Sequence, residues 1–155
     1  NALLDLGRFQ QAISDYEIVL KEEPANVKTR VNMAIAYSSL RNFAKAEEEF
    51  AKAQRHGRTY ADLYVNRAIM YFETQQYAKA LPDYQRYLEL KPDDHQIYND
   101  MGVVYNVMGQ YQKAVESFTR AINISPVKDY YRFRAQAYEK LGNTSAAQQD
   151  RRMAQ

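Results

Sequence analysis

Apolar and small residues recur along the chain at a helical spacing. In two neighbouring stretches they stand at intervals of one, three, four and seven positions: Met33, Ala34, Tyr37 and Leu40, then Ala46, Phe50 and Ala53. Residues at these intervals share one face of an α-helix, so each stretch predicts an amphipathic helix. The polar residues between them fall on the opposite face. No stretch shows the strict alternation expected of a half-buried strand, and the pattern therefore predicts an all-α protein.

The same pattern returns about every 34 residues. One alanine marks its phase at steps of 34, 34, 34 and 33 residues: Ala12, Ala46, Ala80, Ala114 and Ala147. Upstream of four of these alanines, a tyrosine follows a small residue by three positions: Tyr37, Tyr71, Tyr105 and Tyr138. A period of this length indicates a helical repeat architecture. Small residues let two antiparallel helices approach closely, and the aromatic residues fill the grooves between them.

Each block predicts two helices joined by a turn. The predicted helices span residues 27–40, 44–56, 61–74, 78–90, 95–108, 112–124, 128–141 and 144–154, after a leading half block that ends near residue 22. The turns are expected at equivalent positions: Gly7, Arg41, Gln75, Gly109 and Gly142. Where Arg58 replaces a proline that ends other blocks, Gly57 is expected to end its helix in the left-handed conformation.

This 34-residue helix-turn-helix unit resembles the tetratricopeptide repeat family. The resemblance divides the chain into a partial unit and four further ones: residues 1–26, 27–60, 61–94, 95–127 and 128–155. The chain departs from the family where tryptophan is usual, because tyrosine stands there in three units and Arg30 in one. We expect residues 1–155 to form a single domain. Since the sequence begins with Asn1, we also expect it to be part of a longer protein.

The resemblance implies an α-solenoid of stacked antiparallel helix pairs, wound as a right-handed superhelix of about four and a half units. It also implies a non-enzymatic scaffold for protein–protein interaction. In this family the concave groove, formed mainly by the first helix of each unit, holds a peptide or a helix of a partner protein. No cofactor is implied.

The face of each first helix opposite its alanine and tyrosine positions holds the candidate partner-binding residues. They comprise a polar row, an apolar row and four flanking side chains: Asn32, Asn66 and Asp100, then Ile35, Ile69 and Val103, then Phe72, Asn99, Asn106 and Arg132. Asparagine can donate and accept hydrogen bonds toward a peptide backbone, and an apolar row can receive alternate side chains. Two other interpretations stay open: the aliphatic residues pack between adjacent first helices, and the asparagines are merely solvated.

Composition and charge exclude several other classes of function. The chain has no cysteine and two histidines, His56 and His95, which lie in different blocks, so neither a disulfide nor a metal site is expected. There are 21 Lys and Arg against 19 Asp and Glu, and blocks of negative net charge interrupt the positive ones. Without a continuous basic stripe, nucleic-acid binding is not expected. No apolar run approaches the roughly 18 residues that cross a bilayer.

The sequence leaves two non-enzymatic functions open. The first is the groove-binding scaffold. The alternative is an assembly module, in which the ends of the stack or exposed tyrosines mediate homo-oligomerisation or docking to the rest of the parent protein. An enzyme is not expected, because there is no nucleophile and base pair, no phosphate-binding glycine loop and no metal-ligand spacing. The stretch before residue 8 lacks the basic and apolar regions of a signal peptide, and the sequence assigns no compartment.

Overall fold

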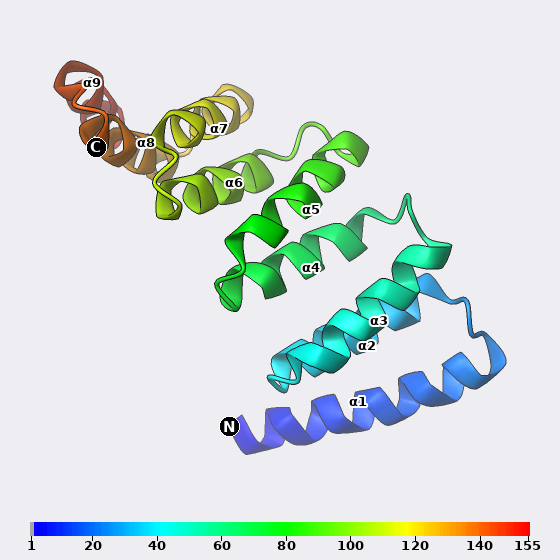
Figure 1. Ribbon diagram of the computed structural model, residues 1–155. Helices are drawn as coiled ribbons and strands as arrows, with labels where there is room; N and C mark the ends of the chain where they lie inside the picture. Colours follow the sequence, from blue (N-terminus) through cyan, green and yellow to red (C-terminus); the bar gives the residue numbers. More distant parts are fainter. Residues whose placement is uncertain (1) are drawn as a thin grey trace. The chain divides into compact units, whose positions relative to one another are not determined.

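The computed structural model describes residues 2–155, with side chains from Gly7 onward. These residues form nine α-helices, and no strand occurs in this part of the chain (Figure 1). The chain divides into two compact units, the first ending at Gln76 and the second spanning Tyr77–Gln155. The boundary falls in the turn that follows the fourth helix.

Unit 1 holds four helices: α1 (Ala2–Glu22), α2 (Val27–Ser39), α3 (Phe43–His56) and α4 (Ala61–Glu73). Helices α2 and α3 form an antiparallel pair, with α1 packed on α2 (Figure 1). Helix α4 contacts both α2 and α3. Successive first helices of the repeat, α2 and α4, therefore lie next to each other in this unit.

Unit 2 holds five helices: α5 (Tyr77–Leu90), α6 (His95–Val107), α7 (Tyr111–Ile124), α8 (Lys128–Lys140) and α9 (Thr144–Met153). The antiparallel pairs α6–α7 and α8–α9 follow one another (Figure 1). Helix α5 packs on α6, and α7 and α6 both contact α8. Each of the eight helices predicted after the leading half block is present, with bounds within one residue of the prediction.

The turns between paired helices share one backbone geometry. Four residues at the predicted turn positions have positive φ angles of 60° to 76°: Arg41, Gln75, Gly109 and Gly142. In each turn the next residue donates its backbone N–H to the carbonyl of the repeat tyrosine, as Asn42 does to Tyr37 at 2.8 Å. This is the Schellman arrangement that ends a helix through a left-handed residue. The four predicted turns after residue 40 are confirmed.

The turn predicted at Gly7 is wrong. Helix α1 runs without interruption from Ala2 to Glu22 and passes through this glycine. A glycine inside a helix costs only about 1 kcal/mol, so the helix continues through it.

The left-handed cap predicted at Gly57 is also wrong. Gly57 ends α3 with a φ of −134°, which is not a left-handed conformation. Its role is steric, because a β-carbon at this position would lie 2.5 Å from Cγ1 of Val27. Glycine is required here for the close approach of the start of α2 to the end of α3.

The core follows the repeat. In unit 1, Ala46 and Phe50 of α3 are fully buried, and in unit 2 Ala114 and Phe118 of α7 occupy the equivalent buried positions. Gly102 of α6 stands against Phe118, since a β-carbon there would lie 2.5 Å from the ring. The predicted close approach of paired helices at small residues is therefore present in both units.

Candidate protein-binding surfaces

Three of the predicted groove residues meet in one hollow of unit 1. Ile35 of α2 lines it together with Asn66 and Ile69 of α4, and the hollow has a volume of about 150 Å³. The remaining lining residues are Ser38, Ser39, Phe50, Met70 and Glu73. Because α2 and α4 are neighbours, the equivalent positions of two successive repeats lie side by side. We call this feature the inner hollow.

The inner hollow combines an apolar floor with a polar edge. Phe50 is fully buried beneath it, whereas 40% of Ile69 is exposed. The Asn66 side chain donates from Nδ2 to the backbone carbonyl of Asp62 at 2.7 Å. That bond holds the amide in place and leaves Oδ1 as an acceptor. The arrangement can receive an apolar side chain and accept a backbone N–H beside it.

Two predicted residues of unit 1 do not line the inner hollow. Asn32 of α2 and Phe72 of α4 are both half-buried. Neither is among the residues that surround the hollow. The polar row expected from the sequence is thus represented in the hollow by Asn66, without Asn32.

Four further predicted residues share α6 in unit 2. Asn99, Asp100, Val103 and Asn106 are all half-buried. Asn99 donates from Nδ2 to the Asp100 carboxylate at 3.4 Å. The amide oxygens of Asn99 and Asn106 are buried and have no hydrogen-bond partner within the described chain. A buried acceptor without a partner costs about 1–3 kcal/mol.

Burial shapes the electrostatics around Asp100. Desolvation raises the pKa of the Asp100 carboxyl above its ordinary value; the Asn99 amide opposes this shift, and the nearby Asp94 adds to it. Burial, and then the Asp100 carboxylate, also raise the pKa of the Tyr84 hydroxyl on α5. The ionised form of Asp100 is therefore less favourable in the folded protein than in water.

The last predicted residue, Arg132, lies on α8. Its side chain is 58% exposed and forms an ion pair with Asp129 of the same helix at 3.0 Å. Arg132 does not line the inner hollow, and it does not belong to the half-buried group on α6. An exposed pair of this kind contributes little to stability.

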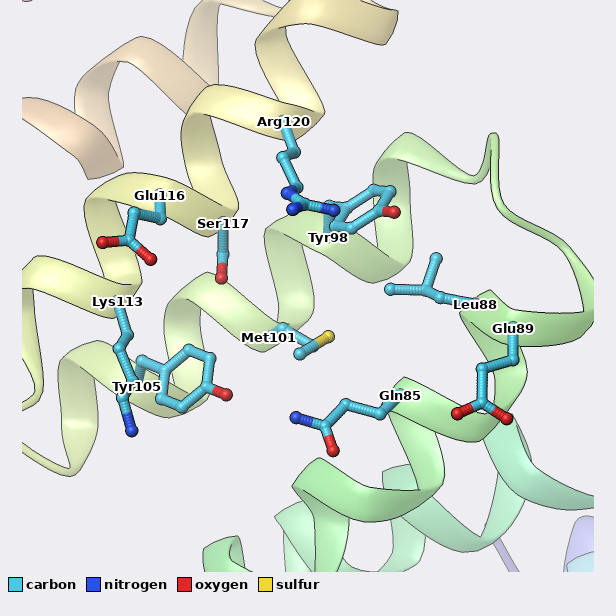
Figure 2. Close-up of a pocket in the computed structure, with 10 residues that line it drawn as sticks. All are labelled: Gln85, Leu88, Glu89, Tyr98, Met101, Tyr105, Lys113, Glu116, Ser117 and Arg120. Carbon is cyan, nitrogen blue, oxygen red and sulfur yellow. The ribbon is translucent and has the colours of Figure 1, made fainter.

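The structure also contains a larger groove that the sequence reasoning missed. It has a volume of about 490 Å³ and lies over α6, between α5 and α7 (Figure 2). Its lining comes from these three helices: Gln85, Leu88 and Glu89, then Tyr98, Met101 and Tyr105, then Lys113, Glu116, Ser117 and Arg120. We call this feature the outer groove. None of the predicted partner-binding residues lines it.

The sequence of the chain matches models of a known protein family. Two family models described as "Tetratricopeptide repeat" match residues 3–66 and 59–126, so together they span most of the chain. The chain belongs to the tetratricopeptide repeat family. The predicted fold class, an all-α solenoid of antiparallel helix pairs, is confirmed, and this family supports a role in protein–protein interaction.

Solved structures of one protein, MamA, resemble this tetratricopeptide repeat chain closely. "Crystal structure of MamA" is 29% identical, covers 96% of this chain and 87% of its own, and superposes with a TM-score of 0.88. "Crystal structure of MamA protein" is also 29% identical, covers 96% and 81%, and gives 0.87. "MamA RS-1 ArsTM double mutant", at 18% identity with 96% and 84% covered and a TM-score of 0.87, shares the fold. No curated protein sequence matches the chain.

Two further features are absent from the described residues. No helix there is both long and apolar enough to cross a membrane. No group of three or more His, Asp or Glu side chains in the same residues could hold a metal ion.

Proposed function

We propose that this protein is a non-enzymatic protein-interaction module that binds an extended segment of a partner protein at the inner hollow. The observation that carries the proposal is the meeting of Ile35, Asn66 and Ile69 between α2 and α4. These side chains come from equivalent faces of two successive repeats. Such a surface suits a chain that presents side chains and backbone groups in alternation.

The chemistry of the hollow favours one apolar side chain of the partner. Ile35 and Ile69 supply apolar contact, and Phe50 closes the floor. Asn66 Oδ1 can accept a backbone N–H of the partner, and Ser38 and Ser39 offer hydroxyl groups beside it. Because a flexible segment loses entropy when it binds so small a site, we expect a dissociation constant on the order of micromolar.

The competing interpretation is that both isoleucines only pack the two helices together. The exposure of Ile69 speaks against this, since 40% of its surface stays in contact with water. A side chain that served packing alone would be expected to bury more of its area, because each buried Å² of apolar surface stabilises by about 25 cal/mol.

The test compares partner capture by the wild type and by two variants. Asn66→Ala/Ile69→Ser removes the polar and apolar groups of the hollow. Ile124→Ser is the matched control, because Ile124 of α7 is 41% exposed and lies outside the hollow. Proteins captured from a cell lysate would be identified by mass spectrometry, and the leading partner would then be titrated calorimetrically against each purified chain.

We expect the double variant to lose the partner by at least tenfold in affinity and the control to keep it. Equal affinity of all three chains, with circular dichroism showing equal helicity, would refute binding at the inner hollow. Failure of the wild type to capture any protein would count against the interaction function itself.

A second candidate function, assembly, is favoured by the surface of α1. This helix packs on α2, yet it exposes 60% of Ile18 and 39% of Val19. Neighbouring exposed aliphatic residues are typical of a face that another chain covers. Light scattering of wild type and Ile18→Ser at rising concentration tests it. A mass above the monomer that falls in the variant would support assembly, and a constant monomeric mass would exclude self-association through this face.

A further inference from the structure

We propose that the outer groove is a second binding surface, which takes an extended acidic segment of another protein. The inference rests on residues of unit 2 that the inner hollow does not use.

The outer groove lies where a neighbouring repeat holds a buried ion pair. In the last helix pair, Arg134 of α8 and Asp150 of α9 form a bidentate pair at 2.8 and 2.7 Å. The residues 33 positions earlier are Met101 of α6 and Ser117 of α7, and both line the groove. This repeat therefore replaces a long cation and its carboxylate by a thioether and a small hydroxyl. The volume that the pair would fill is left open.

Because Ser117 stands where other repeats have a carboxylate, Arg120 lacks an acidic partner at this position. Three of the four buried polar residues at this repeat position are acidic, namely Glu49, Asp83 and Asp150, and the fourth is Ser117. In α3, Lys52 bonds the buried Glu49 carboxylate at 2.7 Å. Arg120 stands at the phase of Lys52 in α7. Because Ser117 replaces the acid, Arg120 has no such carboxylate to neutralise it.

Two cations consequently line the α7 wall of the groove. The Lys113 ammonium lies 5.6 Å from the centre of the Tyr105 ring, and the Arg120 guanidinium lies 5.7 Å from that of Tyr98. Neither forms an ion pair within the described residues. A cation held over a ring is fixed in position while its N–H groups at the edge stay free for a carboxylate. The wall thus offers two preorganised sites for negative charge.

The carboxylates at the rim do not cancel this charge. Glu89 of α5 is paired with Arg86 at 2.5 Å. Glu116 lies on α7 between the two cations, and Figure 2 shows its carboxylate turned away from Arg120. The charge complement of the wall is therefore an acidic partner.

The polar centre of the groove distinguishes an extended segment from a helix. The Ser117 hydroxyl and the Gln85 amide lie on opposite sides of Met101 within the groove (Figure 2). A helix satisfies its own backbone groups and would leave these donors and acceptors unused, whereas an extended backbone can bond to both.

The spacing of the two cations sets the pattern of the segment. Lys113 and Arg120 are seven residues apart on α7, which corresponds to about 10.5 Å along a helix at 1.5 Å per residue. An extended chain covers that distance in about three residues at 3.3 Å each. The proposed segment therefore carries two acidic residues three positions apart, with an apolar side chain between them that contacts Met101 and Leu88.

The test selects peptides from a phage library of random 12-residue sequences on the full 155-residue chain. We expect the wild type to enrich peptides with two acidic residues three positions apart and an apolar residue between them. A fluorescein-labelled copy of the most enriched peptide would then be titrated by fluorescence anisotropy against the variants. Its affinity should fall several-fold between 50 and 300 mM NaCl, because the contacts are ionic and exposed.

Two variants and one control separate charge from shape. Lys113→Glu/Arg120→Glu reverses the α7 wall at solvent-facing positions. Met101→Arg/Ser117→Asp fills the groove with the ion pair of the next repeat and leaves the net charge unchanged. Lys45→Glu is the control. Lys45 stands on α3 at the same phase as Lys113, and its ammonium lies 5.2 Å from the centre of the Tyr37 ring on α2.

We expect each double variant to weaken peptide binding at least tenfold and Lys45→Glu to leave it unchanged. Absence of enrichment, enrichment of peptides without acidic pairs, or undiminished binding by both folded double variants would overturn the proposal. Competition by a poly(U) oligonucleotide at the same concentration as unlabelled peptide would also overturn it, since the groove would then select negative charge and not a protein segment.

Discussion

The buried pair of Arg134 and Asp150 gives the sharpest test of how one repeat differs from the next. The Asp150 side chain is 5% exposed and that of Arg134 is 15% exposed. The Asp150 carboxylate, hydrogen-bonded to the guanidinium, raises the pKa of Arg134, so the arginine stays charged. Substituting Arg134→Met and Asp150→Ser copies into this repeat the residues that stand at Met101 and Ser117.

The single variants should be far more damaging than the double. Arg134→Met leaves the Asp150 carboxylate buried without its partner, at a cost of about 3–5 kcal/mol. Asp150→Ser leaves the arginine its bond to Thr119 Oγ1 at 2.9 Å and its place against the Tyr131 and Tyr138 rings, so we expect a smaller loss of about 2–3 kcal/mol. The double variant buries no unpaired charge and should unfold within about 1 kcal/mol of the wild type.

Urea unfolding followed by circular dichroism measures this cycle. The four chains are the wild type, the two single variants and the double variant, all at pH 7. With a dependence of about 1–3 kcal/mol per molar urea, a loss of 3 kcal/mol lowers the midpoint by about 1–3 M. We expect the coupling between the two sites to be at least about 3 kcal/mol. Additive costs would refute the view that a repeat can exchange this ion pair for neutral side chains as a unit.

Two further predictions concern backbone strain and ionisation. Gln75→Gly should stabilise the protein by about 0.5–1 kcal/mol in urea unfolding, because Gln75 has a φ of 60°. Gly109→Ala should destabilise it by about 1 kcal/mol, because Gly109 has a φ of 72° with open space around it. The opposite signs would contradict the turn assignment. Asp100→Asn should stabilise at pH 7 but not at pH 3. Burial raises the pKa of Asp100 in the folded protein. The contribution of this side chain to the stability of the fold is therefore complete below the unfolded pKa of about 3.9, and it is lost as pH rises through the folded pKa. An equal effect at both pH values would refute this.

The helices were predictable from the sequence because local patterns determine them. The phase of the alanines and tyrosines placed each helix after the leading half block within one residue. It also placed a turn at Gln75, and the structure adds that this turn has a positive φ although the residue is not a glycine. The two errors arose where the same residue type serves different ends. Gly7 lies inside a helix, and Gly57 admits the side chain of Val27. A sequence shows that a glycine is present, but not whether a positive φ or a close contact requires it.

The binding surfaces were harder to predict, because they depend on which faces of different helices adjoin. Asn32 and Asn66 share a repeat phase, yet Asn66 lines the inner hollow and Asn32 does not. Ile69 could be assigned to a surface only from its exposure, since an isoleucine at that phase is equally suited to packing between helices. Periodicity identifies the side of a helix, whereas the depth of a side chain follows from the neighbouring helix.

The outer groove could have been located from the sequence by comparing residues at equivalent positions of the repeats. The phase of Asp150 is acidic and buried in three repeats and is Ser117 in the fourth, and the phase of Arg134 holds Met101 in that same repeat. Met33 also stands at the phase of Arg134, but that repeat keeps its buried acid, because Arg30 and Lys52 each bond Glu49 at 2.7 Å. Only the repeat of Met101 and Ser117 lacks both the arginine and the acid. In this repeat a space lies open over α6. Arg120 also lacks the neighbouring carboxylate that Lys52 has in Glu49 at the equivalent position of α3. In a protein whose repeats share one packing scheme, a paired departure from that scheme is therefore where a distinct binding surface is to be sought.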